Sequence, residues 1–164
     1  MSKDRLYIAY GSNLNLAQMA FRCPTAIAVD TATLQGYDLL FRGAPGNAHA
    51  TIEPGMGSVP VLLWKLKPKD EAALDRYEGW PHYYHKQNTT VDLGGNSVSA
   101  MVYIMNAGHA LNQPSQRYFD TIAHGYFMAG FDTDVLFHAL EQSYPEVDQE
   151  LEEPDDSIDM DWWR

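Results

Sequence analysis

The chain has 164 residues, of which 45% are hydrophobic, and its formal net charge is −11. This length fits one domain with a core that needs neither disulfides nor metals, and Cys23, the single cysteine, can form no internal disulfide. No stretch approaches 18 apolar residues and no signal-peptide pattern opens the chain, so we expect a cytoplasmic protein with no membrane partner.

The negative charge is concentrated at the C-terminus. Residues 141–164 hold ten acids and one base, a net charge of −9, which leaves −2 for the rest of the chain. A nearly neutral body without a basic run is a poor nucleic-acid binder, because phosphate contacts need clustered Lys and Arg. We therefore predict one domain over residues 1–145 and an acidic tail over 146–164. Trp162 and Trp163 of that tail could dock on the body, on a second copy in a homodimer or on another partner.

The first half of the chain predicts mostly strands. A strand at Leu6–Tyr10 is followed by a helix at Leu16–Arg22, for which Asn15 is a suitable N-cap. Further strands are predicted at 26–33, 37–42, 48–52 and 59–66, the first two joined near Gly36. The glycine-rich residues 43–58 lack a lysine or a following helix, so they predict a flexible loop rather than a phosphate-binding one.

The second half alternates helices with a hairpin. Pro68 and Gly79 mark the two ends of a helix over residues 67–80. Strands follow at 83–91 and 97–105, joined by a turn at 94–96. Helices are then predicted at 115–129, ended by Gly130, and at 133–141. Because strands and helices mix without a strict βαβ alternation, the pattern predicts an α+β domain with a mixed or largely antiparallel sheet.

The turn after the first strand is a candidate binding loop. Gly11, Ser12 and Asn13 lie where the chain leaves a strand and enters a helix. Backbone N–H groups at such a turn can bind an anion or a carbonyl oxygen. Gly11 permits a close approach of the ligand, and Ser12 and Asn13 add side-chain donors. The alternative is an ordinary corner made of small polar residues.

Glu78 is the candidate acid–base residue. It lies in the last turn of its predicted helix, where the helix dipole disfavours a carboxylate. Four aromatic residues flank it and would desolvate it, namely Tyr77, Trp80, Tyr83 and Tyr84. Both effects raise a carboxyl pKa toward the range that general acid–base catalysis needs. The alternative is a solvated surface glutamate.

Other residues indicate a functional site less strongly than the loop and Glu78 do. Tyr118 falls at helical spacing with core positions, so it either packs in the core or points its hydroxyl into a pocket. His82 and His85 would point to opposite faces of a strand and could not share a metal. Cys23 is expected to pack in the core.

Taken together, four stretches resemble the γ-glutamylcyclotransferase family, which includes AIG2-like proteins. They are "YIAYGSNLN", "LDRYEGWPHYY", "VYIMN" and "PSQRY" with the following "I..GY", and the resemblance covers Leu6 to Leu140. It implies an α+β fold with a small mixed, largely antiparallel, barrel-like sheet flanked by helices. It also implies a cavity with Glu78 as the catalytic residue. The substrate-binding residues it implies are Tyr7, Tyr10, Gly11, Ser12, Asn13, Leu14, Tyr84 and Tyr118.

The resemblance implies an enzyme that releases 5-oxoproline and a free amine from a small-molecule γ-glutamyl amide. The substrate's α-amine would attack its own γ-carbonyl, with Glu78 as general base and then general acid, and with no metal or cofactor. Which amine leaves stays open, and residues 43–57 and 106–114 are expected to decide it. Two alternatives stay open as well: a non-catalytic binding protein for a glutamyl-like ligand, and an assembly protein that works through the acidic tail.

Overall fold

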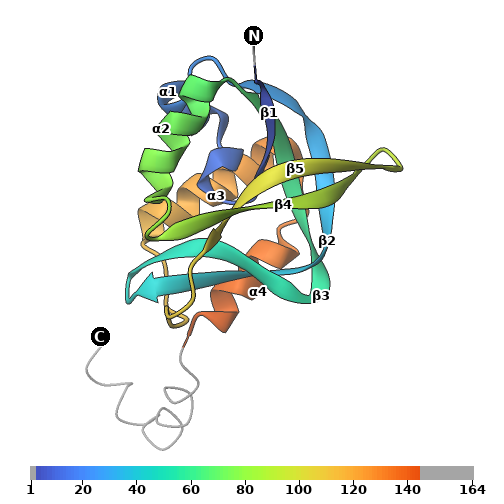
Figure 1. The fold of residues 1–164 in the computed structure, drawn as a ribbon. Helices are drawn as coiled ribbons and strands as arrows, with labels where there is room; N and C mark the ends of the chain where they lie inside the picture. Colours follow the sequence, from blue (N-terminus) through green and yellow to red (C-terminus); the bar gives the residue numbers. More distant parts are fainter. Residues whose placement is uncertain (1–2, 145–164) are drawn as a thin grey trace, which may run out of the picture.

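A computed structural model describes residues 3–144, and five of its strands close into a barrel (Figure 1). Around the barrel the order is β1-β3-β2-β4-β5. The strands are β1 (Arg5–Ala9), β2 (Ile27–Ala44), β3 (Asn47–Leu66), β4 (Tyr84–Leu93) and β5 (Asn96–Met105). Neighbouring strands are antiparallel except β1 and β5, which run parallel and close the barrel. The predicted α+β class with a mixed, largely antiparallel sheet is confirmed.

Strands β2 and β3 form one long hairpin, and here the sequence prediction was wrong. The strands predicted at 26–33 and 37–42 are one strand, because Gly36 (φ 82°) sits at a bulge and does not end β2. The segments 48–52 and 59–66 likewise belong to one strand. The glycine-rich residues 43–58 are paired for most of their length, and the turn is confined to Pro45 and Gly46.

Two glycines of β3 lie against the carboxylate of Asp38 on β2. The backbone N–H of Gly57 donates to Asp38 Oδ1 over 3.0 Å. A Cβ at Gly55 or Gly57 would lie within 2.4 Å of an Asp38 oxygen. The glycines therefore make room for the Asp38 side chain, so this stretch is ordered strand although its composition suggests a loop.

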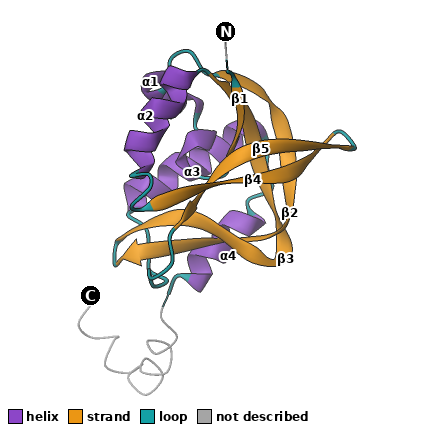
Figure 2. Ribbon diagram, in the orientation of Figure 1, coloured by secondary structure: helices purple, strands orange, loops and turns teal. Residues whose placement is uncertain are grey.

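Within residues 3–144, four helices and a short 3-10 turn flank the barrel (Figure 2). They are η1 (Ser12–Leu14), α1 (Leu16–Arg22), α2 (Pro68–Glu78), α3 (Gln116–Ala129) and α4 (Asp134–Gln142). Helices α1 and α2 lie side by side, α3 contacts η1, and α4 contacts β2. The predicted caps are present: the Asn15 side chain accepts from Gln18 N, and Gly79 and Gly130 end α2 and α3 in the left-handed conformation.

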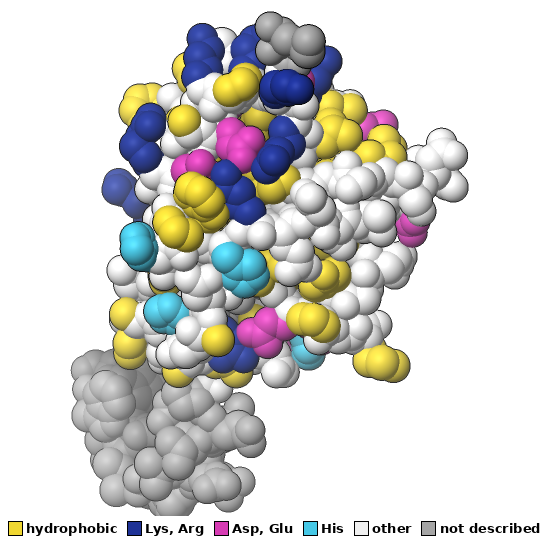
Figure 3. All heavy atoms as spheres, viewed as in Figure 1, with side chains coloured by type: hydrophobic (Ala, Val, Ile, Leu, Met, Phe, Trp, Pro, Cys, Tyr) yellow, Lys and Arg dark blue, Asp and Glu magenta, His cyan; other side chains and the backbone are white. Residues whose placement is uncertain are grey.

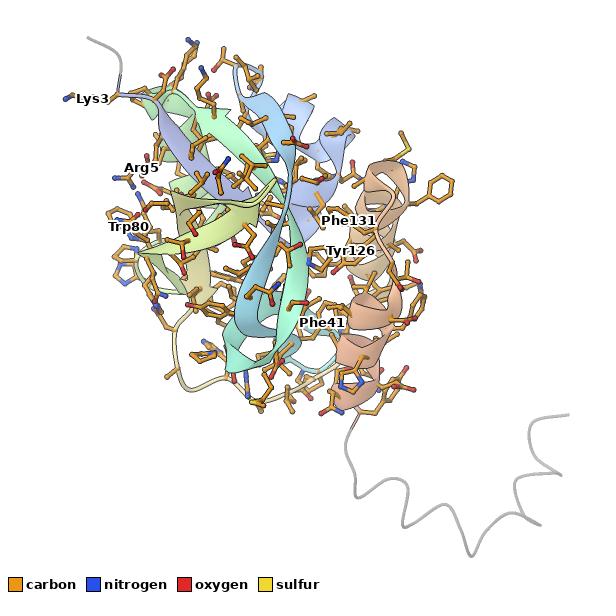
Figure 4. The ribbon with its side chains drawn as sticks, turned by 90° about the vertical axis from the view of Figure 1, so that its right-hand side faces the viewer. Lys3, Arg5, Phe41, Trp80, Tyr126 and Phe131 are labelled. Atoms are coloured by element: carbon orange, nitrogen blue, oxygen red, sulfur yellow. The ribbon has the colours of Figure 1, made fainter. Side chains whose placement is uncertain are left out.

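An aromatic layer fixes α3 against the barrel. Phe41 of β2 lies 6.1 Å from Phe119 and 6.5 Å from Tyr118, measured between ring centres. Tyr126 packs against Phe131 over 5.5 Å. Figure 4 shows Phe41, Tyr126 and Phe131 between the strands and the helices. This packing determines where α3 presents Tyr118 to the barrel.

Charged side chains on the face shown in Figure 3 are mixed in sign. Lys and Arg gather at the end of the molecule near the N-terminus, with acids between them. There Arg5 pairs with Glu71 over 3.0 Å, and Lys86 pairs with Glu71 and Asp75 over 2.6 and 2.9 Å. These pairs compensate the charges of Arg5 and Lys86.

Two further predictions from the sequence concern a membrane span and the acidic tail. No helix within residues 3–144 is long and apolar enough to cross a membrane. The predicted acidic tail, with Trp162 and Trp163, lies outside the described residues.

Candidate active site

A cavity of about 110 Å³ opens where β1, η1, β3, the end of α2, β4 and α3 meet. Eight of the nine predicted site residues line it: Tyr7, Tyr10, Gly11, Ser12, Asn13, Glu78, Tyr84 and Tyr118. The lining is completed by His49, Ala50, Tyr77, Tyr83 and Tyr103. The ninth, Leu14, does not line the cavity, because its side chain is buried in the core.

The loop at the end of β1 folds into the single turn η1. Leu14 N donates to Gly11 O over 3.0 Å, and Asn15 N donates to Ser12 O over 3.1 Å. These bonds leave the N–H groups of Ser12 and Asn13 outside the turn's own hydrogen bonding. A Cβ on Gly11 would lie 3.3 Å from Ala50 Cβ. The missing side chain therefore lets the loop approach β3 closely.

The side chains of Ser12 and Asn13 hold the loop in place. Ser12 Oγ lies 3.0 Å from Tyr77 Oη, and Asn13 Nδ2 donates to Tyr7 Oη over 2.8 Å. Asn13 Oδ1 accepts a hydrogen bond from Arg22. Arg22 also stacks on the Tyr77 ring. Both polar side chains, expected as ligand donors, thus already have partners within the protein.

Glu78 is the last residue of α2, and Gly79 (φ 66°) turns the chain away after it. Glu78 lines the cavity, its carboxyl group is buried, and within residues 3–144 it makes no hydrogen bond. Burial raises the pKa of Glu78 to about 7, and the Arg22 guanidinium opposes this rise. The alternative of a solvated surface glutamate does not fit this geometry.

The hydroxyl groups of the four tyrosines that were predicted as site residues fall into two types. Tyr10 donates to Tyr103 O and Tyr84 donates to Ala50 O, each over 2.6 Å, so their oxygens can only accept from a ligand. Tyr7 Oη accepts from Asn13, and Tyr118 Oη accepts from Ala50 N over 3.0 Å. Their own protons remain available. Burial raises the pKa of all four hydroxyls, so each stays protonated.

Sequence reasoning missed part of the lining. His49 lies on β3, within the short strand predicted at residues 48–52, and no local pattern marks it as a site residue. Tyr77 and Tyr83 line the cavity as the expected aromatic wall beside Glu78. Trp80 was expected in the same wall, but it is 42% exposed and stacks on Lys86 instead, with 4.2 Å from Lys86 Nζ to the ring centre.

Known proteins share this arrangement of motifs and fold. Residues 7–129 match the model of the family described as gamma-glutamyl cyclotransferase, AIG2-like. A Bos taurus gamma-glutamylcyclotransferase is 30% identical in an alignment of 82 positions, which covers 45% of this chain and 44% of the bovine chain. The aligned part thus spans less than half of that relative.

Two solved structures overlay with a TM-score of 0.72, each covering 78% of this chain and 81% of its own. One is a gamma-glutamyl cyclotransferase, 28% identical, and the other is an uncharacterized protein from Homo sapiens, 27% identical. The family match covers most of the chain and includes both the η1 loop and Glu78. The chain therefore belongs to the AIG2-like gamma-glutamyl cyclotransferase family.

Proposed function

We propose that the chain releases 5-oxoproline and a free amine from a γ-glutamyl amide, with Glu78 as general base and then general acid. The observation that carries this proposal is a buried carboxyl group, in a cavity lined by tyrosines, that has no hydrogen bond to any residue the structure describes. Its pKa of about 7 lets Glu78 take up and return a proton near neutral pH.

The reaction balances with the substrate and Glu78 alone. Glu78 takes a proton from the substrate's α-ammonium, and the freed amine attacks the γ-carbonyl carbon to form a five-membered ring. The bond from that carbon to the leaving nitrogen then breaks as Glu78 returns its proton to that nitrogen. The ring nitrogen still carries a second proton, which passes through Glu78 to the departing amine, so the amine leaves as an ammonium ion. The ring product is 5-oxoproline, and Glu78 ends as it began. Holding the amine and the carbonyl together supplies a large part of the acceleration.

The hydrogen-bonding groups of the cavity match a glutamyl group. The free protons of Tyr7 and Tyr118 and the backbone N–H groups of Ser12 and Asn13 suit the α-carboxylate and the γ-carbonyl oxygen. The oxygens of Tyr10 and Tyr84 suit the α-ammonium. The cavity volume of about 110 Å³ is well below the roughly 300–1,000 Å³ of pockets for drug-sized ligands. It therefore suits the glutamyl part, with the leaving amine outside.

The test is a panel of substrates. The protein is incubated with γ-glutamyl amino acids, γ-glutamyl amines and glutathione, and 5-oxoproline is measured by chromatography. Release from at least one compound supports the proposal. Calorimetric binding without release from any compound would instead identify a non-catalytic binding protein that uses the same cavity.

A further inference from the structure

We propose that Asp75 is a positioning residue for the reaction: its carboxylate ties the last turn of α2 to the barrel and so fixes where the Glu78 carboxyl group lies at the cavity. This inference rests on the proposed function and adds a residue that does not itself line the cavity. Asp75 lies three residues before Glu78 on α2. At this spacing the two residues are neighbours on the helix surface, one turn apart.

The Glu78 carboxyl group depends on its helix for its position. Among the residues that the structure describes, it has no hydrogen-bond partner that could orient it. It must nevertheless reach two nitrogen atoms of the substrate in turn, the α-amine and the leaving nitrogen. Misplacing a reacting group by about 1 Å can cost roughly 100-fold in rate. The contacts that fix α2 against the barrel therefore set the geometry on which both proton transfers depend.

The Asp75 carboxylate makes two such contacts, one to β5 and one to β4. Tyr103 Oη of β5 donates to Asp75 Oδ1 over 2.6 Å. Lys86 Nζ of β4 lies 2.9 Å from the same oxygen and 3.1 Å from Asp75 Oδ2. Burial, together with the hydrogen bond to Asp75, raises the pKa of Tyr103, so its hydroxyl stays protonated as the donor. Tyr103 is buried and the other two side chains are largely so, which limits screening of these bonds by solvent.

The backbone of Asp75 also holds the chain on the far side of Glu78. Trp80 N donates to Asp75 O over 2.9 Å, and the left-handed conformation of Gly79 permits this bond. Lys86, which pairs with Asp75, lies 4.2 Å from the centre of the Trp80 ring. Glu78 thus lies between two residues, Asp75 and Trp80, that are bonded to each other and share a partner on β4.

Helix stability alone does not account for Asp75, because the helix dipole opposes a carboxylate in the last turn. Glu71, in the first turn of the same helix, is in the place that the dipole favours. It pairs with Arg5 of β1 over 3.0 Å and with Lys86 over 2.6 Å. Glu71 therefore ties the first turn of α2 to the barrel, and Asp75 ties the turn that carries Glu78. The Arg5–Glu71 pair is the same kind of bond on the same helix, at the end away from Glu78.

The test compares Asp75→Ala and Asp75→Asn, with the best γ-glutamyl compound of the panel as substrate. Asp75→Ala removes both side-chain contacts with the barrel. We expect its kcat for 5-oxoproline release to fall about 10–100-fold while KM stays within about threefold of wild type, because Glu78 shifts and the glutamyl-binding groups do not. Asp75→Asn keeps an oxygen acceptor for Tyr103 and should keep kcat within about threefold of wild type. Arg5→Met breaks the Arg5–Glu71 pair and is the matched control, with kcat and KM near wild type.

The possible failures are distinguishable. A folded Asp75→Ala protein with wild-type kcat overturns the inference, and so does an equal loss of kcat in Asp75→Ala and Asp75→Asn, or a rise in KM as large as the fall in kcat. If Asp75→Ala does not fold, Tyr103→Phe removes the hydrogen bond to Asp75 but keeps the ring, and wild-type kcat in that variant overturns the inference. All these results leave the proposed function standing. If wild-type protein releases 5-oxoproline from no compound of the panel, the proposed function fails and the inference fails with it.

Discussion

The guanidinium carbon of Arg22 lies 3.4 Å from the centre of the Tyr77 ring. Arg22 also donates hydrogen bonds to Asn13 and Gln18, and the Tyr77 hydroxyl lies 3.0 Å from Ser12 Oγ. Tyr77 precedes Glu78 in α2. The Arg22–Tyr77 pair thus joins the η1 loop to the helix end that carries the proposed acid–base residue.

Replacing Arg22 should move the pH dependence of the reaction. The positive charge of Arg22 lowers the pKa of Glu78, so Arg22→Met should raise it further. Because the ionised carboxylate is the proposed base, the acidic limb of kcat/KM for 5-oxoproline release should shift to higher pH. Arg22→Lys keeps the charge and is the control. If the acidic limb of kcat/KM lies at the same pH in Arg22→Met as in wild type, the proposed effect of Arg22 on the Glu78 pKa is contradicted.

Glu78 should destabilise the folded protein at high pH. Its pKa is about 7 when folded and 4.5 when exposed, so between these values the unfolded state binds fewer protons. Stability should therefore fall as the pH rises from about 4.5 to 7 and change little from this group outside that window. Glu78→Gln should match wild type at pH 4 and exceed it at pH 8 by up to roughly 3 kcal/mol. Urea unfolding at both pH values checks this, and an equal difference at both would contradict it.

Gly125 of α3 lets the η1 loop pack closely, and Gly125→Ala should disturb both stability and activity. A Cβ there would lie 2.7 Å from Leu14 Cβ and 2.8 Å from the Leu14 carbonyl carbon. An alanine normally stabilises a helix interior by about 1 kcal/mol relative to glycine, but we expect a net loss of about 1–3 kcal/mol from the steric clash.

Thermal unfolding and 5-oxoproline release from Gly125→Ala measure these two effects. His124→Ala, at the exposed neighbouring position, is the control and should be close to wild type in both. A stabilised, fully active Gly125→Ala protein would show that the loop has room to move.

The Tyr118 hydroxyl should contribute to kcat/KM because it can donate a hydrogen bond to a substrate in the cavity. Tyr118→Phe removes that donor and the acceptor for Ala50 N. We expect kcat/KM to fall by about 10–100-fold. Tyr37→Phe makes the same chemical change at a hydroxyl that binds Gln87 outside the cavity, and should leave kcat/KM near wild type. Similar kinetics for the two variants would argue against a role for Tyr118 in binding or catalysis.

Local patterns in the sequence were enough to predict the helix ends and to indicate the η1 loop and Glu78 as candidates, whose roles only the family resemblance implied. Asn15, Gly79 and Gly130 act through their nearest neighbours in the chain, so their roles as caps could be predicted. Glu78 was identified for a similar reason, since its position before Gly79 and among tyrosines is a local feature.

Features that depend on distant residues could not be predicted. Strand β3 continues past Gly55 and Gly57 because Asp38, far away in the chain, fills the space beside them. His49 reaches the cavity through the register of that long hairpin. The side chains of Ser12 and Asn13 turn toward Tyr77 and Tyr7, and that choice needs the assembled barrel and α2.

Glu78→Gln tests the central claim most directly. With the best substrate of the panel, this variant should release 5-oxoproline about 100–10,000-fold more slowly than wild type, because the amide can neither take nor give the proton. Calorimetry should still detect substrate binding. Glu71→Gln, the same change on the same helix outside the cavity, should turn over near the wild-type rate. Wild-type turnover by Glu78→Gln would contradict the account.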